Sequence, residues 1–300
     1  MPAAEKMGKT MTRMQRSALI AVLLLAGGNV FAEDTVRYVR YAYEDTVSYG
    51  VQEGDTIRQL SAAPYLGGTT TGASVALADV QLLAPAEPSK VYAVGYNYDS
   101  HRGDRVLPPH PPIFLKLPTT IIGPGADIIY PDGATDVHYE AELVVVIGKT
   151  ASKVSVEDAS DYIFGVTAGN DVSERTWQAN DLQWFRGKAT DTFGPLGPAI
   201  VTGLDYKDLL VQSRLNGKVM QSQSTRDHIH DIDTIVSFIS QTSTLYPGDV
   251  IYTGTPGSTS AMQPGDIIEI EVEGVGILRN QIARCRFDYQ AASPVRRCGR

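Results

Sequence analysis

The stretch HYEAELVVVIG, residues 138–148, places two glutamates one residue apart before a run of β-forming residues. Residues 143–147 predict a buried strand. Side chains in a strand alternate between its two faces, so Glu140 and Glu142 share one face, while Ala141 and Leu143 share the other. The Cα atoms of the two glutamates lie about 6.5 to 7 Å apart. At this separation their carboxylates can bind one cation. Two like charges at the start of a buried strand therefore indicate a site.

A third carboxylate follows the next apolar segment, YIFGVTAGNDVSER at residues 162–175. This segment predicts a strand that ends at Gly169-Asn170-Asp171. An acid at a strand end can point into a cleft formed with neighbouring strands. Three oxygen ligands without Cys or His favour Mg²⁺, Mn²⁺ or Ca²⁺ over zinc. The alternative, from spacing alone, is that Glu140, Glu142 and Asp171 are separate solvated acids.

A candidate base lies in KVYAVGYNYDSHRGD, residues 90–104. A β-type run reaches Gly95, and a polar loop with His101 and Asp104 follows. If the loop turns helically, the acid three residues after the histidine can orient the imidazole to take a proton from water. The alternative is an ordinary histidine in a polar loop. No G-x-S-x-G elbow or phosphate-binding loop occurs in the sequence.

The remaining patterns predict a mainly β protein of the α+β class with few helices. Residues 36–60 predict a small antiparallel β unit, because aromatic and β-branched residues alternate with turn signals. Asn216-Gly217 predicts a hairpin, and Pro-Gly-Asp turns at 247–249 and 264–266 each precede a strand.

Two segments predict helices. Residues 173–185 are compatible with one, and residues 227–242 carry isoleucines at helical spacing.

The first 32 residues predict a secretory signal peptide, because a basic segment precedes the apolar run 18–26, and Val30-Phe31-Ala32 ends in a small residue. The run is shorter than the ~20 residues that a membrane-crossing helix needs. We therefore expect cleavage after Ala32, export to the periplasm or medium, and no stable membrane insertion after cleavage. A retained membrane anchor is the alternative.

The charge of the chain argues for small-molecule partners. The formal net charge is −8, and removing residues 1–32, with four basic groups and one acid, makes it −11. An acidic chain without Lys/Arg runs is a poor candidate for binding nucleic acid. Cys285 and Cys298 are the only cysteines. Export would permit a disulfide between them, but Cys285 reads as an ordinary strand residue, so the pairing stays open.

Several stretches together resemble the fumarylacetoacetate hydrolase family, and their order and spacing over residues 36–287 carry the resemblance. They are VGYNYDSH (94–101), PPIFLKLPTTIIGPGADI (111–128), HYEAELVVVIG (138–148), GVTAGNDVSERTWQ (165–178), GKATDTFGPLGP (187–198), LNGKVMQ (215–221), and YPGDVIYTGTP (246–256) with MQPGD (262–266). The resemblance implies a mixed β-sandwich-like roll behind a small, variable N-terminal β unit. The expected divisions are 1–32, signal peptide; 33–88, β unit and linker; 89–290, catalytic domain; and 291–300, polar tail.

The resemblance also implies roles for individual residues. Glu140, Glu142 and Asp171 would hold a divalent cation, usually Mg²⁺, on which a 2-oxo acid or 1,3-diketo acid is bound. The other positions that match the family pattern are His101, as the base for water; Lys188, which stabilises developing negative charge; Thr192, as a nearby threonine; and Arg175, Gln178 and Thr255, as substrate contacts. Relatives are usually dimers, so a homodimer is expected.

Two departures from the family pattern affect the chemistry. The lid loop has Asp104 where relatives often have a glutamate, and Gly257-Ser258-Thr259-Ser260-Ala261 replaces a second glycine-rich turn. The first expected function is metal-dependent hydrolysis of a C–C bond in an acylpyruvate or related diketo acid. The second is isomerisation, hydration or decarboxylation of a 2-oxo-alkenoic acid. The third is an exported binding protein without turnover.

Overall fold

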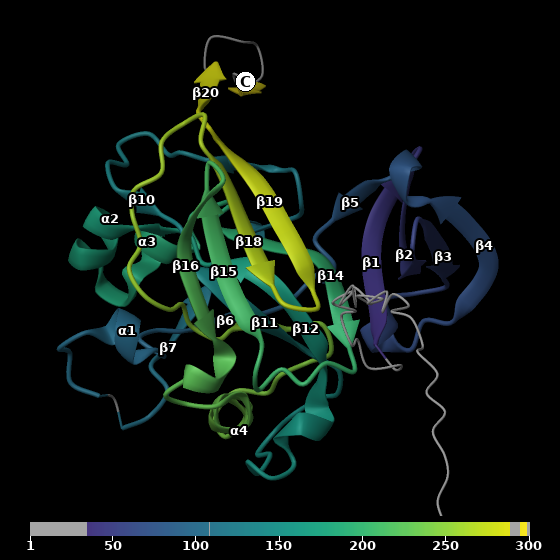
Figure 1. The fold of residues 1–300 in the computed structure, drawn as a ribbon, viewed down its shortest axis with the longest axis horizontal. Coiled ribbons are helices and arrows are strands. Elements are labelled where there is room, and N and C mark those ends of the chain that lie inside the picture. Colours follow the sequence, from purple (N-terminus) through teal and green to yellow (C-terminus); the bar gives the residue numbers. More distant parts are fainter. Residues whose placement is uncertain (1–34, 108, 289–294, 299–300) are drawn as a thin grey trace, which may run out of the picture. The chain divides into compact units, whose positions relative to one another are not determined.

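The computed structural model describes residues 35–107, 109–288 and 295–298, without the side chains from residue 285 onward. The predicted signal peptide lies outside these ranges, as do the side chains of Cys285 and Cys298. Within them, no helix is both long and apolar enough to cross a membrane. Most elements are strands, which confirms the mainly β fold (Figure 1).

The N-terminal β unit forms as predicted from its turn signals. The two-residue turns at 44–45 and 54–55 join its first three strands in antiparallel register. Its strands are β1 (Val36–Tyr43), β2 (Thr46–Glu53), β3 (Thr56–Leu60), β4 (Thr70–Ala76) and β5 (Gln81–Leu83). Because β1 also pairs with β14, these strands extend the main sheet of the chain.

The main sheet has twelve strands in the order β4-β3-β2-β1-β14-β12-β11-β17-β6-β7, with β5 paired to β1 and β8 paired to β14. Its central strand β11 is buried along its whole length. The bounds are β6 (Val91–Val94), β7 (Ile113–Lys116), β8 (Ile121–Ile122), β11 (Ala141–Ile147), β12 (Ile163–Asn170), β14 (Gly194–Thr202) and β17 (Val250–Tyr252).

A second sheet of five strands packs on β11 and β12, in the order β16-β15-β18-β19-β9 (Figure 1). These are β9 (Asp127–Ile129), β15 (Leu210–Leu215), β16 (Lys218–Ser224), β18 (Ile267–Val272) and β19 (Gly276–Ala283). The predicted hairpin is confirmed: Asn216 and Gly217 have φ of 51° and 80° and join β15 to β16. Two short pairs complete the strands: β10 (Val137–His138) with β13 (Ser173–Glu174), and β20 (Cys285–Asp288) with β21 (Val295–Cys298).

The core explains how β11 holds two acids. Leu143, Val145 and Ile147 belong to the apolar cluster that lies between the sheets. Val144 and Val146 belong to the cluster on the other face. Glu140 and Glu142 share the parity of the second set, as the alternation predicts. The buried valines behind them therefore fix the strand that presents both carboxylates.

The helices are short: α1 (Asp99–Arg102), α2 (Arg175–Asn180), α3 (Phe185–Ala189) and α4 (Ile232–Ser240). The predicted helix 173–185 is wrong in extent. Glu174 caps α2 by accepting a hydrogen bond from Trp177 N, and Gln183 and Trp184 break the helix with φ near +58°. The helix expected within 227–242 begins only at Ile232, because Asp231 caps it through Thr234 N.

Candidate active site

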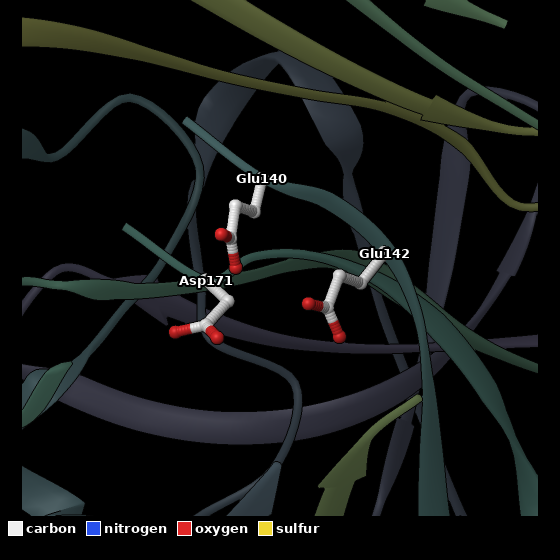
Figure 2. Close-up of side chains that lie close together, drawn as sticks. All are labelled: Glu140, Glu142 and Asp171. Carbon is white, nitrogen blue, oxygen red and sulfur yellow. The ribbon is translucent and has the colours of Figure 1, made fainter. Parts of the chain in front are cut away.

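Three carboxylates meet at the start of β11 and the end of β12. Antiparallel pairing sets Ala141 opposite Asn170, and Asp171 N donates to Glu140 O at 2.9 Å. One ligand oxygen from each of Glu140, Glu142 and Asp171 lies within 4.8 Å of the others (Figure 2). All three residues are buried. The structure therefore brings together the acids that the sequence singled out.

Two buried lysines contact this cluster. Lys188 Nζ lies 2.7 Å from Glu140 Oε2 and 2.6 Å from Asp171 Oδ2. Lys116 Nζ lies 2.6 Å from Asp171 Oδ1 and donates to the carbonyl of Lys188 at 2.5 Å. Both oxygens of Asp171 are thus paired with ammonium groups.

Close packing of α3 on α2 positions Lys188. A Cβ at Gly187 would lie 2.8 Å from Gln178 N, so the approach of the two helices depends on this glycine. The next residue then directs its side chain onto the carboxylates.

The environments of the acids push their pKa values apart. Burial opposes ionisation of Glu140, but Lys188 and Arg175 hold its pKa below the usual range. Burial raises the pKa of Glu142, and the charges of Asp171 and Glu140 raise it further. Among the described residues, no Lys or Arg forms an ion pair with Glu142, whose Oε2 accepts from Gly254 N at 2.7 Å. The cluster therefore lacks positive charge at Glu142.

The pKa values of Lys116 and Lys188 are shifted in opposite directions. Burial lowers the pKa of Lys116 despite the attraction of Asp171. Burial also opposes ionisation of Lys188, but Asp171 and Glu140 raise its pKa above the ordinary value. Lys188 is therefore held as an ammonium between two carboxylates.

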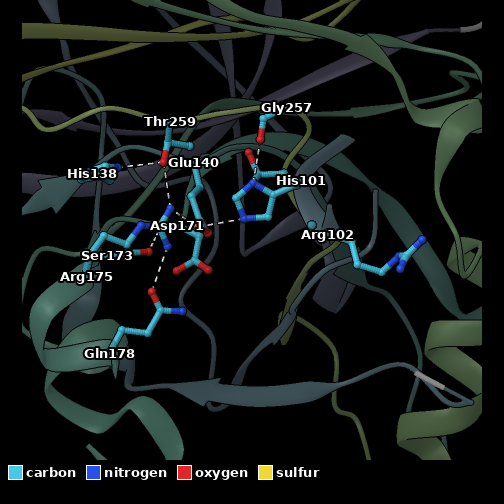
Figure 3. A network of polar contacts seen from close by, with 12 residues as sticks. His101, Arg102, His138, Glu140, Asp171, Ser173, Arg175, Gln178, Gly257 and Thr259 are labelled. Carbon is cyan, nitrogen blue, oxygen red and sulfur yellow. Dashed lines mark hydrogen bonds and ion pairs between the residues drawn. The ribbon is translucent and has the colours of Figure 1, made fainter. Parts of the chain in front are cut away.

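His101 lies on α1 and faces the cluster. Its Nδ1 contacts the carbonyl of Gly257 at 2.7 Å, and its Nε2 lies 3.8 Å from Glu140 Oε1 (Figure 3). A carbonyl can only accept, so Nδ1 carries the proton, and Nε2 of the neutral ring has the free lone pair. This lone pair can accept a proton at the edge of the cluster.

The expected His101–Asp104 dyad is not formed in this structure. Helix α1 ends at Arg102, and Gly103 has φ of 59°, so Asp104 does not follow the histidine on a helical face. Asp104 is exposed and makes no ion pair within the described ranges. The Gly257 carbonyl orients His101 instead.

Arg175 links the cluster to a polar chain. Its Nη2 lies 2.7 Å from Glu140 Oε1 and donates to Thr259 Oγ1 at 2.9 Å, while Nη1 donates to Gln178 Oε1 at 2.8 Å (Figure 3). Thr259 Oγ1 also contacts His138 Nδ1 at 2.8 Å, and His138 Nε2 contacts Asp136 Oδ1 at 2.8 Å. These contacts connect the half-buried Asp136 to Glu140, a candidate metal ligand.

The remaining predicted residues occupy different places. Thr255 is buried beside the cluster and accepts from Gln221 Nε2 at 2.8 Å. Thr192 accepts from Ile129 N at 2.9 Å, and none of its described contacts joins it to the carboxylates.

Two cavities lie beside these groups. A small one of about 20 Å³ is lined by Glu140, Glu142, Lys188, Thr255 and others, and a larger one of about 560 Å³ is lined by His101, Arg175 and Gln178 among others. The smaller space is the size of a water molecule or an ion.

Sequence reasoning missed Lys116, His138, Gln221 and Thr259. A signal existed for Lys116, since it is a single lysine at the end of the apolar strand IFLK. The others became visible only through contacts between distant segments.

The residues present fit a divalent cation. Three buried carboxylates form a hard oxygen set, and Glu142 lacks a cationic partner that an ion would supply. The chemistry of the donors does not distinguish Mg²⁺ from Mn²⁺ or Ca²⁺.

Comparison with known proteins gives two family matches. The fumarylacetoacetate (FAA) hydrolase C-terminal family matches residues 90–283, and the Rv2993c-like N-terminal family matches residues 36–85.

Similar proteins carry different activities in their names. The structure of 5-carboxymethyl-2-hydroxymuconate delta-isomerase from Mycobacterium smegmatis is 44% identical, with a TM-score of 0.79, over 83% of this chain and 99% of that one. Oxaloacetate tautomerase FAHD2A, mitochondrial, of Bos taurus is 40% identical over 68% of this chain and 70% of its own length. Maleylpyruvate hydrolase from Sphingobium sp. SYK-6, in complex with manganese(II) and pyruvate, is 28% identical, with a TM-score of 0.69, over 83% and 99% of the two chains.

Proposed function

The chain belongs to the fumarylacetoacetate hydrolase family, and we propose that it is a divalent-cation-dependent enzyme that moves a proton on a 2-oxo acid, as a tautomerase or double-bond isomerase. The names of two similar proteins, an isomerase and a tautomerase at 44% and 40% identity, support this reaction type. The expected substrates are 2-oxo acids and their enol or alkenoic forms, and the expected cation is Mg²⁺.

The position of His101 carries the proposal. Its Nε2, which has a free lone pair in the neutral ring, lies beside the carboxylate cluster, where it can take a proton from C3 of a 2-oxo acid. The Gly257 carbonyl accepts from Nδ1 and thereby fixes the tautomer in which Nε2, the nitrogen nearer Glu140, is the acceptor. This arrangement suits a base that accepts a proton and returns it in the same turnover.

The step balances within the substrate. The C3–H bond breaks, its electron pair forms the C2=C3 double bond, and the negative charge moves to the oxygen on C2. His101 then returns the proton to that oxygen in a tautomerase, or to a carbon further along the conjugated chain in an isomerase. No oxidant or second reactant is needed.

The other groups stabilise and orient this charge. A divalent cation held by Glu140, Glu142 and Asp171 would supply positive charge for the enolate oxygen. Lys188 adds a buried ammonium beside the same cluster. Arg175 adds a guanidinium at the larger cavity.

C–C hydrolysis, the first expectation from the sequence, is the second candidate. It is favoured by the cavity of about 560 Å³ beside His101, which has room for water next to a substrate, and by the similar maleylpyruvate hydrolase. Here His101 would take a proton from water, the hydroxide would attack the distal carbonyl, and the C–C bond would break to release the enolate of the 2-oxo acid.

Proton NMR in D₂O tests both candidates on one sample. Purified protein with Mg²⁺ is mixed with oxaloacetate, with a 2-hydroxy-dienoate and with an acylpyruvate. Exchange or migration of the C3 proton without fragments supports proton transfer, and two carboxylic fragments indicate hydrolysis. Chelation and His101→Asn should each abolish either reaction. Activity that survives both changes would refute the proposal, and bound ligand without any reaction would indicate a binding protein.

A further inference from the structure

The larger cavity is built to receive negative charge. It has a volume of about 560 Å³, and four of the side chains that line it can carry positive charge: His101, Arg105, His138 and Arg175. No Asp or Glu appears among the described residues that line it. A 2-oxo acid bound at the carboxylate cluster would extend its remaining chain into this space.

Two of these four groups are already engaged. Arg175 uses Nη2 for Glu140 and Thr259, and Nη1 for Gln178. His138 must donate from Nε2 to Asp136, which leaves Nδ1 to accept from the Thr259 hydroxyl.

His101 is engaged as well. Its Nδ1 proton goes to the carbonyl of Gly257. These bonds leave His101 and His138 without a free N–H, and Arg175 is held among three partners.

Arg105 differs from these groups. Its guanidinium lies over the ring of Tyr96, 4.9 Å from the centroid, and Nη1 donates only to the carbonyl of Arg102 at 3.2 Å. In the part of the chain that the structure describes, Arg105 pairs with no carboxylate, whereas Arg102 on the same segment pairs with Asp99. The aromatic ring supports the flat face of the guanidinium and leaves donors at its edge for a carboxylate.

We propose that Arg105 binds a second carboxylate of the substrate and thereby selects dicarboxylic over monocarboxylic 2-oxo acids. This inference rests on the proposed function, since it assumes that the 2-oxo acid end is bound at the carboxylate cluster. Arg105 is a specificity-determining residue and takes no part in the proton transfer.

Isothermal titration calorimetry can measure the contribution of the second carboxylate to affinity separately from that of the 2-oxo acid end. Protein loaded with Mg²⁺ is titrated with 2-oxo dicarboxylic acids of five, six and seven carbons, each paired with the monocarboxylic 2-oxo acid of equal carbon number. For the length that fits, we expect the dicarboxylate to bind about ten-fold more tightly, the size of one charge-assisted hydrogen bond near the surface. Arg105→Gln should remove this preference and leave monocarboxylate affinity within about two-fold, while Arg105→Lys should keep part of it.

Each outcome has a distinct meaning. Arg58→Gln makes the same charge change in the N-terminal β unit and should keep the preference. Equal loss in both Gln variants would overturn the role of Arg105, because net charge alone would explain it. Equal affinity for both ligand types in the wild type would overturn the role of Arg105 and leave the proposed function standing. A preference that survives Arg105→Gln would do the same. If no 2-oxo acid binds the wild type, this inference fails together with the proposed function.

Discussion

Replacing Glu142 by Gln should stabilise the metal-free protein and remove its response to divalent cations. Glu142 is 1% exposed, and within the described ranges neither lysine of the cluster reaches it. A glutamine has the same shape, and its Oε1 can still accept from Gly254 N, so the substitution removes the charge and keeps the hydrogen bond. The negative charges of Asp171 and Glu140 are then no longer repelled by a third negative charge.

The size of the effect follows from the raised pKa of Glu142. Each pH unit by which folding raises the pKa of an acid costs about 1.4 kcal/mol when the group is ionised. A buried polar group left without a partner costs about 1–3 kcal/mol, and a charged group costs more. For a chain of this size 1 kcal/mol corresponds to about 2–4 °C, so we expect the melting temperature of the chelated variant to be several degrees above that of the chelated wild type.

The pH dependence has a definite sign. The folded protein keeps the Glu142 proton to higher pH than the unfolded chain, so the stability of the metal-free wild type falls as pH rises above the ordinary glutamate pKa of 4.5. The advantage of Glu142→Gln should therefore be absent at low pH, grow as pH rises, and level off above the raised pKa.

Thermal melts of both proteins, with chelator and with Mg²⁺, measure these effects. Mg²⁺ at one hundred times its dissociation constant should stabilise the wild type by about 2.7 kcal/mol. The variant should show little of this shift. A variant that melts below the chelated wild type, or that gains as much from Mg²⁺, would refute the assignment of Glu142 as an uncompensated cation ligand.

Asp104→Asn should keep kcat/KM within about two-fold, since Asp104 is exposed and Gly257 orients His101; a ten-fold loss would show that the dyad forms during turnover. Thr259→Val should raise KM several-fold with little change in kcat, because Arg175 loses a bond of 2.9 Å, and Thr259→Ser should restore KM; equal values in both variants would contradict this. Mass spectrometry of protein from its host should find a mature chain that starts at residue 33, and a peptide covering residues 18–26 would argue against cleavage. Light scattering should give the mass of a dimer. A monomer mass at working concentration would contradict this prediction.

The fold was predictable where the signals are local. The turn at 44–45 and Asn216-Gly217 each specify a hairpin within a few residues, and the structure has both. The limits of the helix predicted at 173–185 were not predictable, because they depend on the Glu174 cap and on the left-handed backbone at Gln183 and Trp184. Hydrophobic spacing carries no information about either feature.

The site divides in the same way. Strand alternation alone puts Glu140 and Glu142 on one face, but Asp171 joins them only because β11 pairs with β12 in one register. Lys116 reaches Asp171 across 55 positions of sequence, and Gly257 reaches His101 across 156. The His101–Asp104 spacing suggested a dyad that the end of α1 at Arg102 prevents in this structure. Sequence spacing is a reliable guide only while the secondary structure continues through both residues.

The charge arrangement explains how the chain can fold around three buried acids before a cation binds. Unpaired buried carboxylates are strongly destabilising, yet Lys116 and Lys188 bracket Asp171, and Lys188 and Arg175 bracket Glu140. Positive side chains therefore reach two of the three acids, and the third retains a backbone N–H. The missing positive charge is confined to Glu142, which lines the cavity of about 20 Å³. A divalent ion would add positive charge at the one acid of the three that no described Lys or Arg pairs with.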